Sequence, residues 1–192
     1  MFDFIIYRYW YNKVKGPAAG YRLEFVPDKF KTYDLCLAAV KSYGAALKHV
    51  PKIHMKYEIY LEATKSKPNI IKLVPMGFRT KELCYEAGSR NGNTIEYVPF
   101  YLLTEDICLR AVDKNPESIK YIPDKCKTKN VCYKATSNPI YTGNILKYIP
   151  EKYRTYDICA NAVSKNIRAI SYVPEEYRDS ILNERNNSKI AV

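Results

Sequence analysis

The stretch that decides the fold reads FVPDKFKTYDLCLAAV at residues 25–40 and returns as YIPEKYRTYDICANAV at residues 148–163. Both copies contain a Val-Pro or Ile-Pro pair, and such pairs occur seven times, with their prolines at Pro27, Pro51, Pro75, Pro99, Pro123, Pro150 and Pro174. The spacing is 24 residues five times and 27 residues once. The chain therefore contains about six tandem copies of one 24-residue unit, and we number positions in a unit forward from its proline.

The columns of this repeat predict that each unit starts with an α-helix. Position five is threonine in five of the six units, and a threonine hydroxyl caps helices well. Position seven is an acid or asparagine, near the positive end of the helix dipole. In the first unit, Leu35, Cys36, Ala39 and Val40 follow the helical period. Glycine, asparagine or proline near position sixteen predicts where the helix ends.

A second, shorter helix is predicted to run to the next Val-Pro pair, because proline restricts the residue before it and ends the helix. Residues 27–30 and 174–177 have the pattern of one further helical turn that starts at proline and closes the joint between units with Phe or Tyr. A hairpin of 24 residues is too small to bury both apolar faces, so neighbouring units must stack. The predicted fold is all-α, an α-solenoid of about six stacked two-helix repeats with a period of 24 residues.

The two ends depart from the repeat, as terminal units of such arrays do. We divide the chain into an N-terminal aromatic cap at residues 1–20, a solenoid at 21–178, and a partial helix with a polar tail at 179–192. The cap is left open between helix and strand, and we expect these side chains to cover the first unit: Phe2, Phe4, Ile5, Ile6, Tyr7, Tyr9 and Trp10. The last helix is expected to dissolve at residues 186–188.

The composition favours a folded, soluble protein. Hydrophobic residues make up 47% of the 192, and no apolar run reaches the roughly 18 residues of a membrane span. Residues 1–11 make a poor signal peptide because charges interrupt them and no basic n-region precedes them. The net charge of +11 permits an acidic or phosphate-bearing partner. We expect a cytoplasmic, reducing location and no membrane partner.

Five of the six cysteines form a ladder at position nine, which favours packing over metal binding or disulfides: Cys36, Cys84, Cys108, Cys132 and Cys159. Units about 8 to 10 Å apart would hold successive rungs beyond the ~7 Å that a disulfide spans between α-carbons. His49 and His54 occupy slots where other units carry aromatic residues, so we interpret both as packing residues. With no catalytic motif in the sequence, we expect no cofactor, no metal and no enzymatic activity.

The candidate binding residues are basic columns that stacking would turn into stripes. Position four supplies Lys31, Arg79, Lys127, Arg154 and Arg178, and position twenty-one supplies Lys48, Lys72, Lys120 and Lys147. An ordinary solvated face is the alternative interpretation, because exposed charges commonly pair along the chain at i+3. Three such pairs are available: Lys31 with Asp34, Arg79 with Glu82, and Arg154 with Asp157.

Two further features are candidates for contact with a partner. Tyr33, Tyr57 and Tyr156 lie beside the capping residues, where we expect them to be exposed. The loop at residues 137–144 is longer than its equivalents, and insertions in solenoids often decorate a binding face. Ile140 and Tyr141 are its candidate binding residues.

The pattern Tyr-Val-Pro, Thr-x-Asp-Leu-Cys, Ala-Val and Asn-Gly resembles a tandem-repeat family known as domain of unknown function, number four-one-one-six. The resemblance covers about residues 21–178 and is strongest at 25–40, 121–135 and 148–163. Members are frequent in giant DNA viruses of amoebae and occur in some bacteria, so the resemblance implies a similar source. The family has no established activity and supplies no catalytic residues to carry over.

Two hypotheses about function follow. The first is a non-enzymatic scaffold that binds an unknown protein, and the basic columns would suit an acidic one. The second is nucleic-acid binding, in which phosphates contact the position-twenty-one column: Lys48, Lys72, Lys120 and Lys147. Self-association through an uncapped end is a further option.

Overall fold

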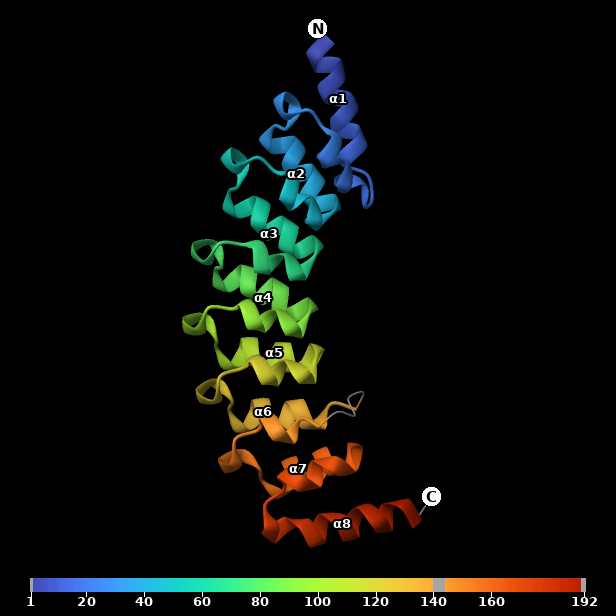
Figure 1. Cartoon of the computed structure of the whole chain (residues 1–192), viewed down its shortest axis with the longest axis vertical. Helices are drawn as coiled ribbons and strands as arrows, with labels where there is room; N and C mark the ends of the chain where they lie inside the picture. The colour runs from blue at the N-terminus through green and yellow to red at the C-terminus, as the bar shows by residue number, and fades with distance from the viewer. Residues whose placement is uncertain (1, 140–143, 191–192) are drawn as a thin grey trace. The chain divides into compact units, whose positions relative to one another are not determined.

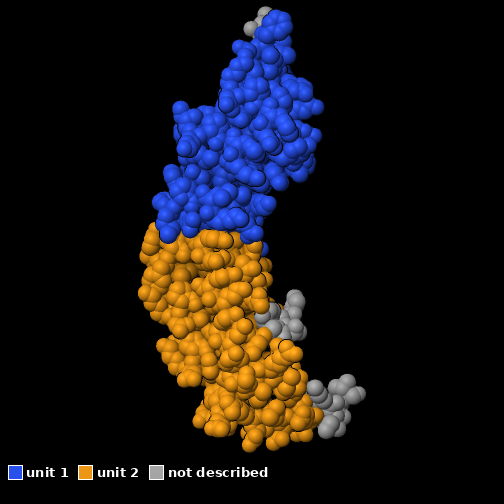
Figure 2. Space-filling model, viewed as in Figure 1, with its two compact units in different colours: residues 1–90 blue, residues 91–192 orange. Residues whose placement is uncertain are grey.

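The computed structural model describes residues 2–139 and 144–190 (Figure 1). Helices make up 79% of the chain, and the described ranges contain no strand. The all-α prediction is therefore confirmed. The chain divides into two compact units, residues 1–90 and residues 91–192, which Figure 2 colours separately. Each unit is described by itself below.

Unit 1 alternates α-helices with 3₁₀ segments, labelled η. Its elements are α1 (Phe2–Val14), η1 (Ala19–Phe25), η2 (Asp28–Phe30), α2 (Tyr33–Ser42), η3 (Gly44–His49), η4 (Lys52–His54), α3 (Tyr57–Ser66), η5 (Pro68–Leu73), η6 (Met76–Phe78) and α4 (Lys81–Arg90). Helix α2 packs against α3, and α3 packs against α4. The order of α-helix, long 3₁₀ segment and short 3₁₀ turn recurs as the 24-residue period predicts.

Unit 2 repeats the same order of elements. They are η7 (Gly92–Tyr97), η8 (Phe100–Leu102), α5 (Glu105–Lys114), η9 (Pro116–Tyr121), η10 (Asp124–Cys126), α6 (Lys129–Ser137), η11 (Leu146–Tyr148), η12 (Glu151–Tyr153), α7 (Tyr156–Lys165), η13 (Ile167–Tyr172) and α8 (Glu175–Ile190). Helix α5 packs against α6, α6 against α7, and α7 against α8. Each unit is thus a stack in which helices contact their neighbours in the sequence.

The predicted threonine caps are present at several helix starts. The Thr32 hydroxyl accepts a hydrogen bond from the Leu35 amide at 3.4 Å, and Thr128 accepts one from Val131 at 3.3 Å. Lys56 stands at position five before α3, and its side chain makes no capping bond. A cap of this kind typically stabilises a helix by about 1 kcal/mol.

The second helix of each repeat is a 3₁₀ helix, a form the sequence did not specify. It has six residues in η3, η5, η7, η9 and η13. A segment this short gains little from α-helical bonds, and 3₁₀ geometry is common in short pieces. The Val-Pro pair then ends it, and the following turn is a 3₁₀ turn of three residues, as in Asp28–Phe30.

The core of each stack is formed by the predicted apolar columns. Leu35, Cys36 and Ala39 are all 0% exposed. All five ladder cysteines are buried, and burial raises the pKa of Cys36 to about 11 and that of Cys108 to about 12. The packing role predicted for the ladder is confirmed.

The alanine at position twelve has a specific reason, which is the close approach of the neighbouring repeat. A Cβ added to Gly44 would collide with the carbonyl oxygen of Ala63, and one on Gly92 would collide with that of Ala111. Backbones that come this close leave no room for a side chain at Gly44 or Gly92, whereas Pro68, Pro116 and Ile167 occupy the same position seventeen in other repeats.

The N-terminal segment corrects one expectation. The segment is a helix, α1, but Phe2, Phe4, Ile5 and Tyr9 are 84%, 68%, 59% and 53% exposed. The prediction that these four side chains cover the first 24-residue repeat is therefore wrong. The helical period places Tyr7, Trp10 and Val14 on the face toward the repeats, and the others point away from it. The 3₁₀ segment η1 also begins at Ala19, inside the predicted cap.

The C-terminal segment corrects a second expectation, that its helix would end near residue 186. Helix α8 begins at Glu175, directly after Pro174, and continues through residues 186–188, where we expected it to dissolve. Its contact with α7 explains the difference, because Ile181 is only 2% exposed and the hydroxyl of Tyr156 is hydrogen-bonded to Glu184.

Candidate binding surface

The cations at position four are used inside the fold. Lys127 is 6% exposed, and its ammonium donates to Asp124 Oδ1 at 2.8 Å and to the Tyr148 carbonyl at 2.7 Å. Lys31 is paired with Asp28 at 2.9 Å, and its side chain is only 12% exposed. A cation in this place neutralises a turn acid or the carbonyl end of a helical segment.

The arginines of the same column bind one equivalent carbonyl, that of the residue before the proline. Each donates through Nε, in the pairs Arg79 to Val74 at 2.8 Å, Arg154 to Ile149 at 2.9 Å, and Arg178 to Val173 at 2.9 Å. The position-four column therefore lies against the backbone and holds the turn to the preceding 3₁₀ segment.

The predicted i+3 ion pairs are wrong for two members of this column. Lys31 binds the acid three residues earlier and not Asp34. Arg154 is 3.9 Å from the earlier Glu151 and does not pair with Asp157. The reason is that the cation points back to the end of the 3₁₀ segment, where carbonyls are exposed, and away from the start of the next α-helix.

The position-twenty-one lysines are exposed, as a binding column requires. In unit 1, Lys48 and Lys72 have no ion-pair partner among the residues that the structure describes. In unit 2, the Lys120 ammonium lies 4.9 Å from the ring centre of the adjacent Tyr121 and 3.7 Å from Glu117. Lys147 lies over its own neighbouring tyrosine ring at 4.7 Å.

The three tyrosines expected to be exposed are half-buried and link neighbouring repeats. The Tyr33 hydroxyl donates to Glu58 at 2.7 Å, and the Tyr57 hydroxyl donates to Glu82 at 2.7 Å. The bond to Glu58 raises the pKa of Tyr33 to about 12. These bonds tie position six of one helix to position seven of the next.

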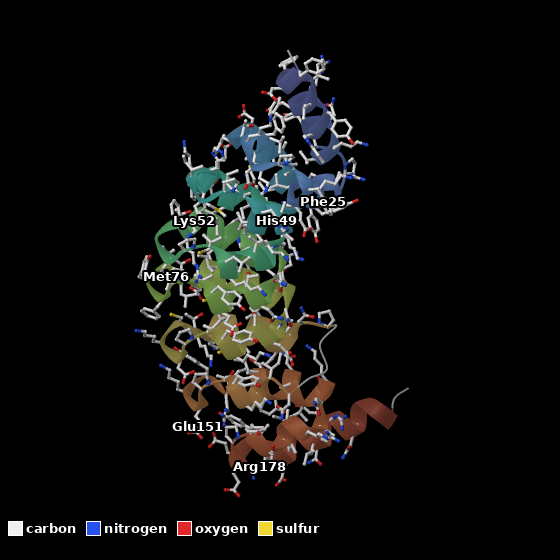
Figure 3. All side chains as sticks on the ribbon, turned by 45° about the horizontal axis from the view of Figure 1, so that its top comes forward. Phe25, His49, Lys52, Met76, Glu151 and Arg178 are labelled. Atoms are coloured by element: carbon white, nitrogen blue, oxygen red, sulfur yellow. The ribbon has the colours of Figure 1, made fainter. Side chains whose placement is uncertain are left out.

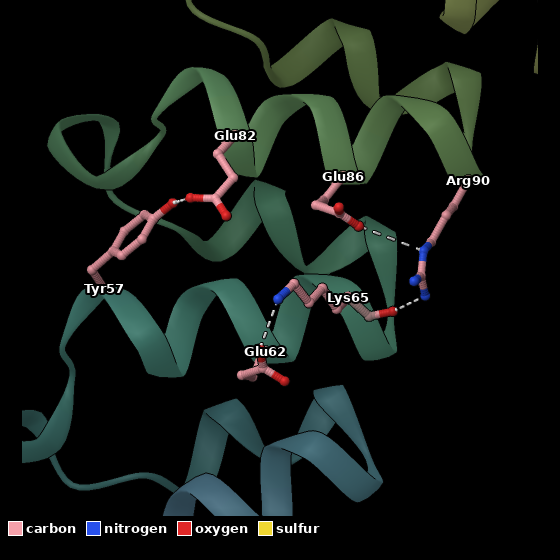
Figure 4. A network of polar contacts seen from close by, with 6 residues as sticks. All are labelled: Tyr57, Glu62, Lys65, Glu82, Glu86 and Arg90. Atoms are coloured by element: carbon pink, nitrogen blue, oxygen red, sulfur yellow. Dashed lines mark hydrogen bonds and ion pairs between the residues drawn. The ribbon is translucent and has the colours of Figure 1, made fainter.

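We call the α-helices of the repeats, α2 to α7, the helix layer. Figure 4 shows how charged side chains of this layer bind one another around α3 and α4. Lys65 pairs with Glu62 at 2.9 Å, and Arg90 lies 3.9 Å from Glu86 while donating to the Lys65 carbonyl. These four charged side chains are therefore engaged with one another or with the backbone.

The turns carry a feature that the sequence analysis missed. Ile53, Leu73 and Met76 are 80%, 49% and 59% exposed in unit 1, and Phe100 and Tyr101 are 47% and 74% exposed in unit 2. The available signal was the variation at positions one and two, where other repeats carry an acid followed by lysine. We call the surface formed by positions one to three, twenty-one and twenty-two the turn edge.

One groove of about 510 Å³ lies on the turn edge of unit 1. Its lining includes Asp28, Lys31, Lys48, His49, Ile53 and His54, and the Asp28 carboxylate pairs with Lys31 at 2.9 Å. The His54 ring also packs edge-on against Tyr33, with 6.3 Å between ring centres, as its predicted packing role requires. Figure 3 labels Lys52 and Met76, which lie on successive turns at the same edge of the unit.

The candidate loop residues Ile140 and Tyr141 lie outside the described residues. Within residues 2–139 and 144–190, no group of three or more His, Cys, Asp or Glu side chains could hold a metal ion. In the same ranges, no helix combines the length and apolar character needed to cross a bilayer.

Comparison with known families gives one finding. Residues 104–154 match the family described as Domain of unknown function (DUF4116). The matched segment runs from the cap of α5 to just past η12, and the match supports the family resemblance there. Comparisons with curated proteins and with solved structures found no match.

Proposed function

We propose that this chain is a non-enzymatic helical-repeat scaffold that binds another protein through the turn edge of its repeats. Exposed, unpaired charge beside apolar surface carries the proposal. Around α3 and α4, Lys65 pairs with Glu62 and Arg90 lies near Glu86, whereas Lys48 and Lys72 are exposed, have no ion-pair partner in the described chain, and belong to the same edge as exposed apolar side chains. Exposed apolar patches with polar rims commonly mark protein-interaction sites.

The chemistry of the cysteines supports a non-enzymatic role. The ladder thiols are buried, and burial raises their pKa to about 11 or 12, so the reactive thiolate is scarce at neutral pH. All six cysteines are free, which supports the reducing, cytoplasmic location that we propose. The family resemblance adds a giant virus or its host as the proposed source.

Capture and rebinding test the scaffold proposal. The intact chain would be immobilised in native lysate, and each captured protein would then be purified and its affinity for the chain measured. Two variants locate the contact, namely Lys48→Glu with Lys72→Glu and Ile140→Ser with Tyr141→Ser. We expect one purified protein to rebind and the lysine variant to weaken its binding at least about tenfold, whereas a loss caused by the Ile140 and Tyr141 variant alone would place the contact outside the turn edge.

Lys129→Glu is the matched control, because Lys129 is exposed on α6 and lies off the turn edge. The proposal is wrong if no captured protein rebinds in purified form. It is also wrong if nuclease treatment removes every captured protein, because nucleic acid would then be the primary partner.

Nucleic-acid binding is the second candidate, and unit 2 carries the observation that favours it. The exposed lysines Lys120 and Lys147 each lie over a neighbouring tyrosine ring, at 4.9 and 4.7 Å. Basic groups interleaved with aromatic rings suit a single strand, whose phosphates and bases need both. Binding of mixed-sequence RNA or DNA would fall steeply with salt if this candidate is correct. No binding at about 50 mM salt would eliminate it.

A further inference from the structure

Two consecutive turns of unit 1 carry basic and apolar residues on the turn edge. We call this set the basic-apolar patch, and it consists of Lys48, Lys52, Ile53, Lys72, Leu73 and Met76. Its members belong to two consecutive turns and to the ends of the 3₁₀ segments that precede them. The groove of about 510 Å³ brings Lys48 and Ile53 together in one lining.

The charge of the patch is not balanced locally. Between Gly44 and Arg79, the only acids are Glu58 and Glu62, and both are engaged by side chains of the helix layer. The remaining basic residues of this stretch include Lys56 and Lys67, which lie over tyrosine rings.

Among the described residues, three ammonium groups of this stretch remain unpaired, and they belong to Lys48, Lys52 and Lys72. All three residues are exposed and have no partner in the described part of the chain. The surface therefore offers three unpaired positive charges, and a partner with carboxylates would complement them.

The apolar members of the patch indicate what else the partner carries. Ile53, Leu73 and Met76 are aliphatic and expose 80%, 49% and 59% of their surface. Aliphatic side chains have no planar face on which a nucleic-acid base stacks, and they cover large side chains of a peptide well. The groove beside Ile53 is a recess that a single side chain can enter.

Turns that have an acid at position one lack this unpaired positive charge. In unit 2, Asp124 and Glu151 stand at position one, where they pair with the position-four cations. An acidic ligand would meet those carboxylates at close range, and like charges repel it. Within unit 1, the charge pattern therefore favours the turns that begin at Lys52 and Met76. Asp28 also lines the groove, and its charge is neutralised there by Lys31 at 2.9 Å.

We infer that the basic-apolar patch binds an acidic peptide segment with large apolar side chains, whose carboxylates pair with the three lysines while an apolar side chain enters the groove beside Ile53. The inference rests on the proposed function, since it names the partner chemistry of the same turn edge. It goes further by assigning the contact to one unit and one class of segment.

Fluorescence anisotropy of the intact chain with synthetic peptides tests this inference. The probe is a fluorescein-labelled peptide composed of Glu, Asp, Leu and Phe. One control peptide replaces Leu and Phe with Ser, and another replaces the acids with Lys. We expect the probe to bind at least about tenfold more tightly than either control peptide, because both charge and apolar contact contribute.

Variants assign the contact to the patch. The affinity for the probe should fall at least about tenfold in the triple variant Lys48→Glu, Lys52→Glu, Lys72→Glu. It should fall about fivefold in the double variant Ile53→Ser, Met76→Ser. Lys125→Glu with Lys152→Glu changes exposed lysines on acid-bearing turns and should leave binding within about twofold. Circular dichroism of each variant checks that the helices persist, and all five single substitutions in the patch change exposed side chains.

Several results would overturn the inference. One is equal binding of the probe and the Ser-substituted peptide, since apolar recognition would then be absent. Another is unchanged binding by the lysine variant. A third is tighter binding of phosphatidylserine vesicles or mixed-sequence RNA than of the probe, lost in the same variant, because the patch would then serve a membrane or a nucleic acid.

Failure here is distinguishable from failure of the scaffold proposal. If a purified protein partner rebinds the chain but keeps its affinity for the patch variants, the scaffold proposal stands and the basic-apolar patch is the wrong contact.

Discussion

The helix layer and the turn edge come from the same 24-residue unit but obey different constraints. In the helix layer, positions eight, nine and twelve keep one residue class in nearly every repeat, and side chains such as Leu35, Cys36 and Ala39 are fully buried. On the turn edge, positions one and two change from repeat to repeat and stay exposed. Packing thus fixes the first region, while the second is free to vary.

The turns themselves fall into two kinds, and position one decides which. Where it is an acid, as at Asp124, position four is a cation that pairs with it, as Lys127 does. Where it is Lys52 or Phe100, position four is Met55 or Leu103. The Met76 turn has no acid and keeps a cation, Arg79, which binds the Val74 carbonyl. The internal pair stabilises the first kind of turn, and the second kind has no such pair and exposes apolar side chains.

The largest expected effect lies in the helix layer. Gly44→Ala places a Cβ against the Ala63 carbonyl oxygen and 2.9 Å from Lys67 Cβ. Overpacking of this kind should lower the free energy of unfolding by about 3 kcal/mol, measured by urea denaturation. Gly88→Ala is the matched control, because no atom lies within 4 Å of its added Cβ, and better helix propensity should raise stability by about 1 kcal/mol. Equal behaviour of the two variants would contradict the close approach.

The next effect tests the acid-bearing turns. Lys127→Met removes the charged hydrogen bonds to Asp124 and to the Tyr148 carbonyl in a buried place. We expect a loss of about 2 kcal/mol in chemical denaturation. Lys129→Met, an exposed neighbour, should change stability by less than about 0.5 kcal/mol.

A double variant asks whether the two kinds of turn are interchangeable. Asp124→Lys with Lys127→Met copies the residues of the Lys52 turn. It should be no less stable than Lys127→Met alone, because the unpaired acid is gone. If the double variant loses clearly more, the pairing rule for positions one and four is wrong.

A smaller effect concerns the bonds between helices. Tyr33→Phe removes the hydroxyl bonded to Glu58 and should cost less than about 1 kcal/mol at pH 7. Because the bond raises the Tyr33 pKa from 10.0 to about 12, its stabilisation is fully present below pH 10 and is lost as pH rises toward 12.

The measurement is the stability difference between wild type and Tyr33→Phe, which should shrink across that pH range. Tyr133→Phe is the control, since Tyr133 is 48% exposed and its hydroxyl has no partner in the described chain. A difference between wild type and Tyr33→Phe that grows with pH would contradict the sign.

The smallest effect belongs to the turn edge of unit 1. Ile53→Ser with Met76→Ser removes two large apolar side chains that are already exposed, so stability should change by less than about 0.5 kcal/mol. Leu35→Ala, in the helix layer, should cost about 3 kcal/mol by the same assay. A large loss in the serine variant would show that the turn edge supports the fold and is not reserved for binding.

Much of the fold could be predicted because local chemistry repeats. The caps at Thr32 and Thr128, the buried cysteine ladder and the turn at Asp28–Phe30 each follow from residue type and spacing. Residues 2–14 were harder, since apolar residues on every side of a helix do not indicate which face packs.

The candidate site was predicted less well. Lys31 has one acid three residues before it and one three residues after it, and only the folded chain shows that it pairs with Asp28. The Tyr148 carbonyl that Lys127 binds lies 21 residues away along the chain. Lys48 and Lys72 have the same charge and are exposed, and sequence spacing alone does not separate the two groups.

The sequence by itself determined an all-α repeat with a 24-residue period, because capping residues, apolar spacing and proline act within a few residues of one another. Only the tertiary structure decided which charges are engaged, which aromatic side chains face solvent and which turns expose apolar groups. The physical reason is that burial, and hydrogen bonds such as the one from Lys127 to the Tyr148 carbonyl, depend on contacts between residues about 20 positions apart, and these exist only once the repeats have stacked.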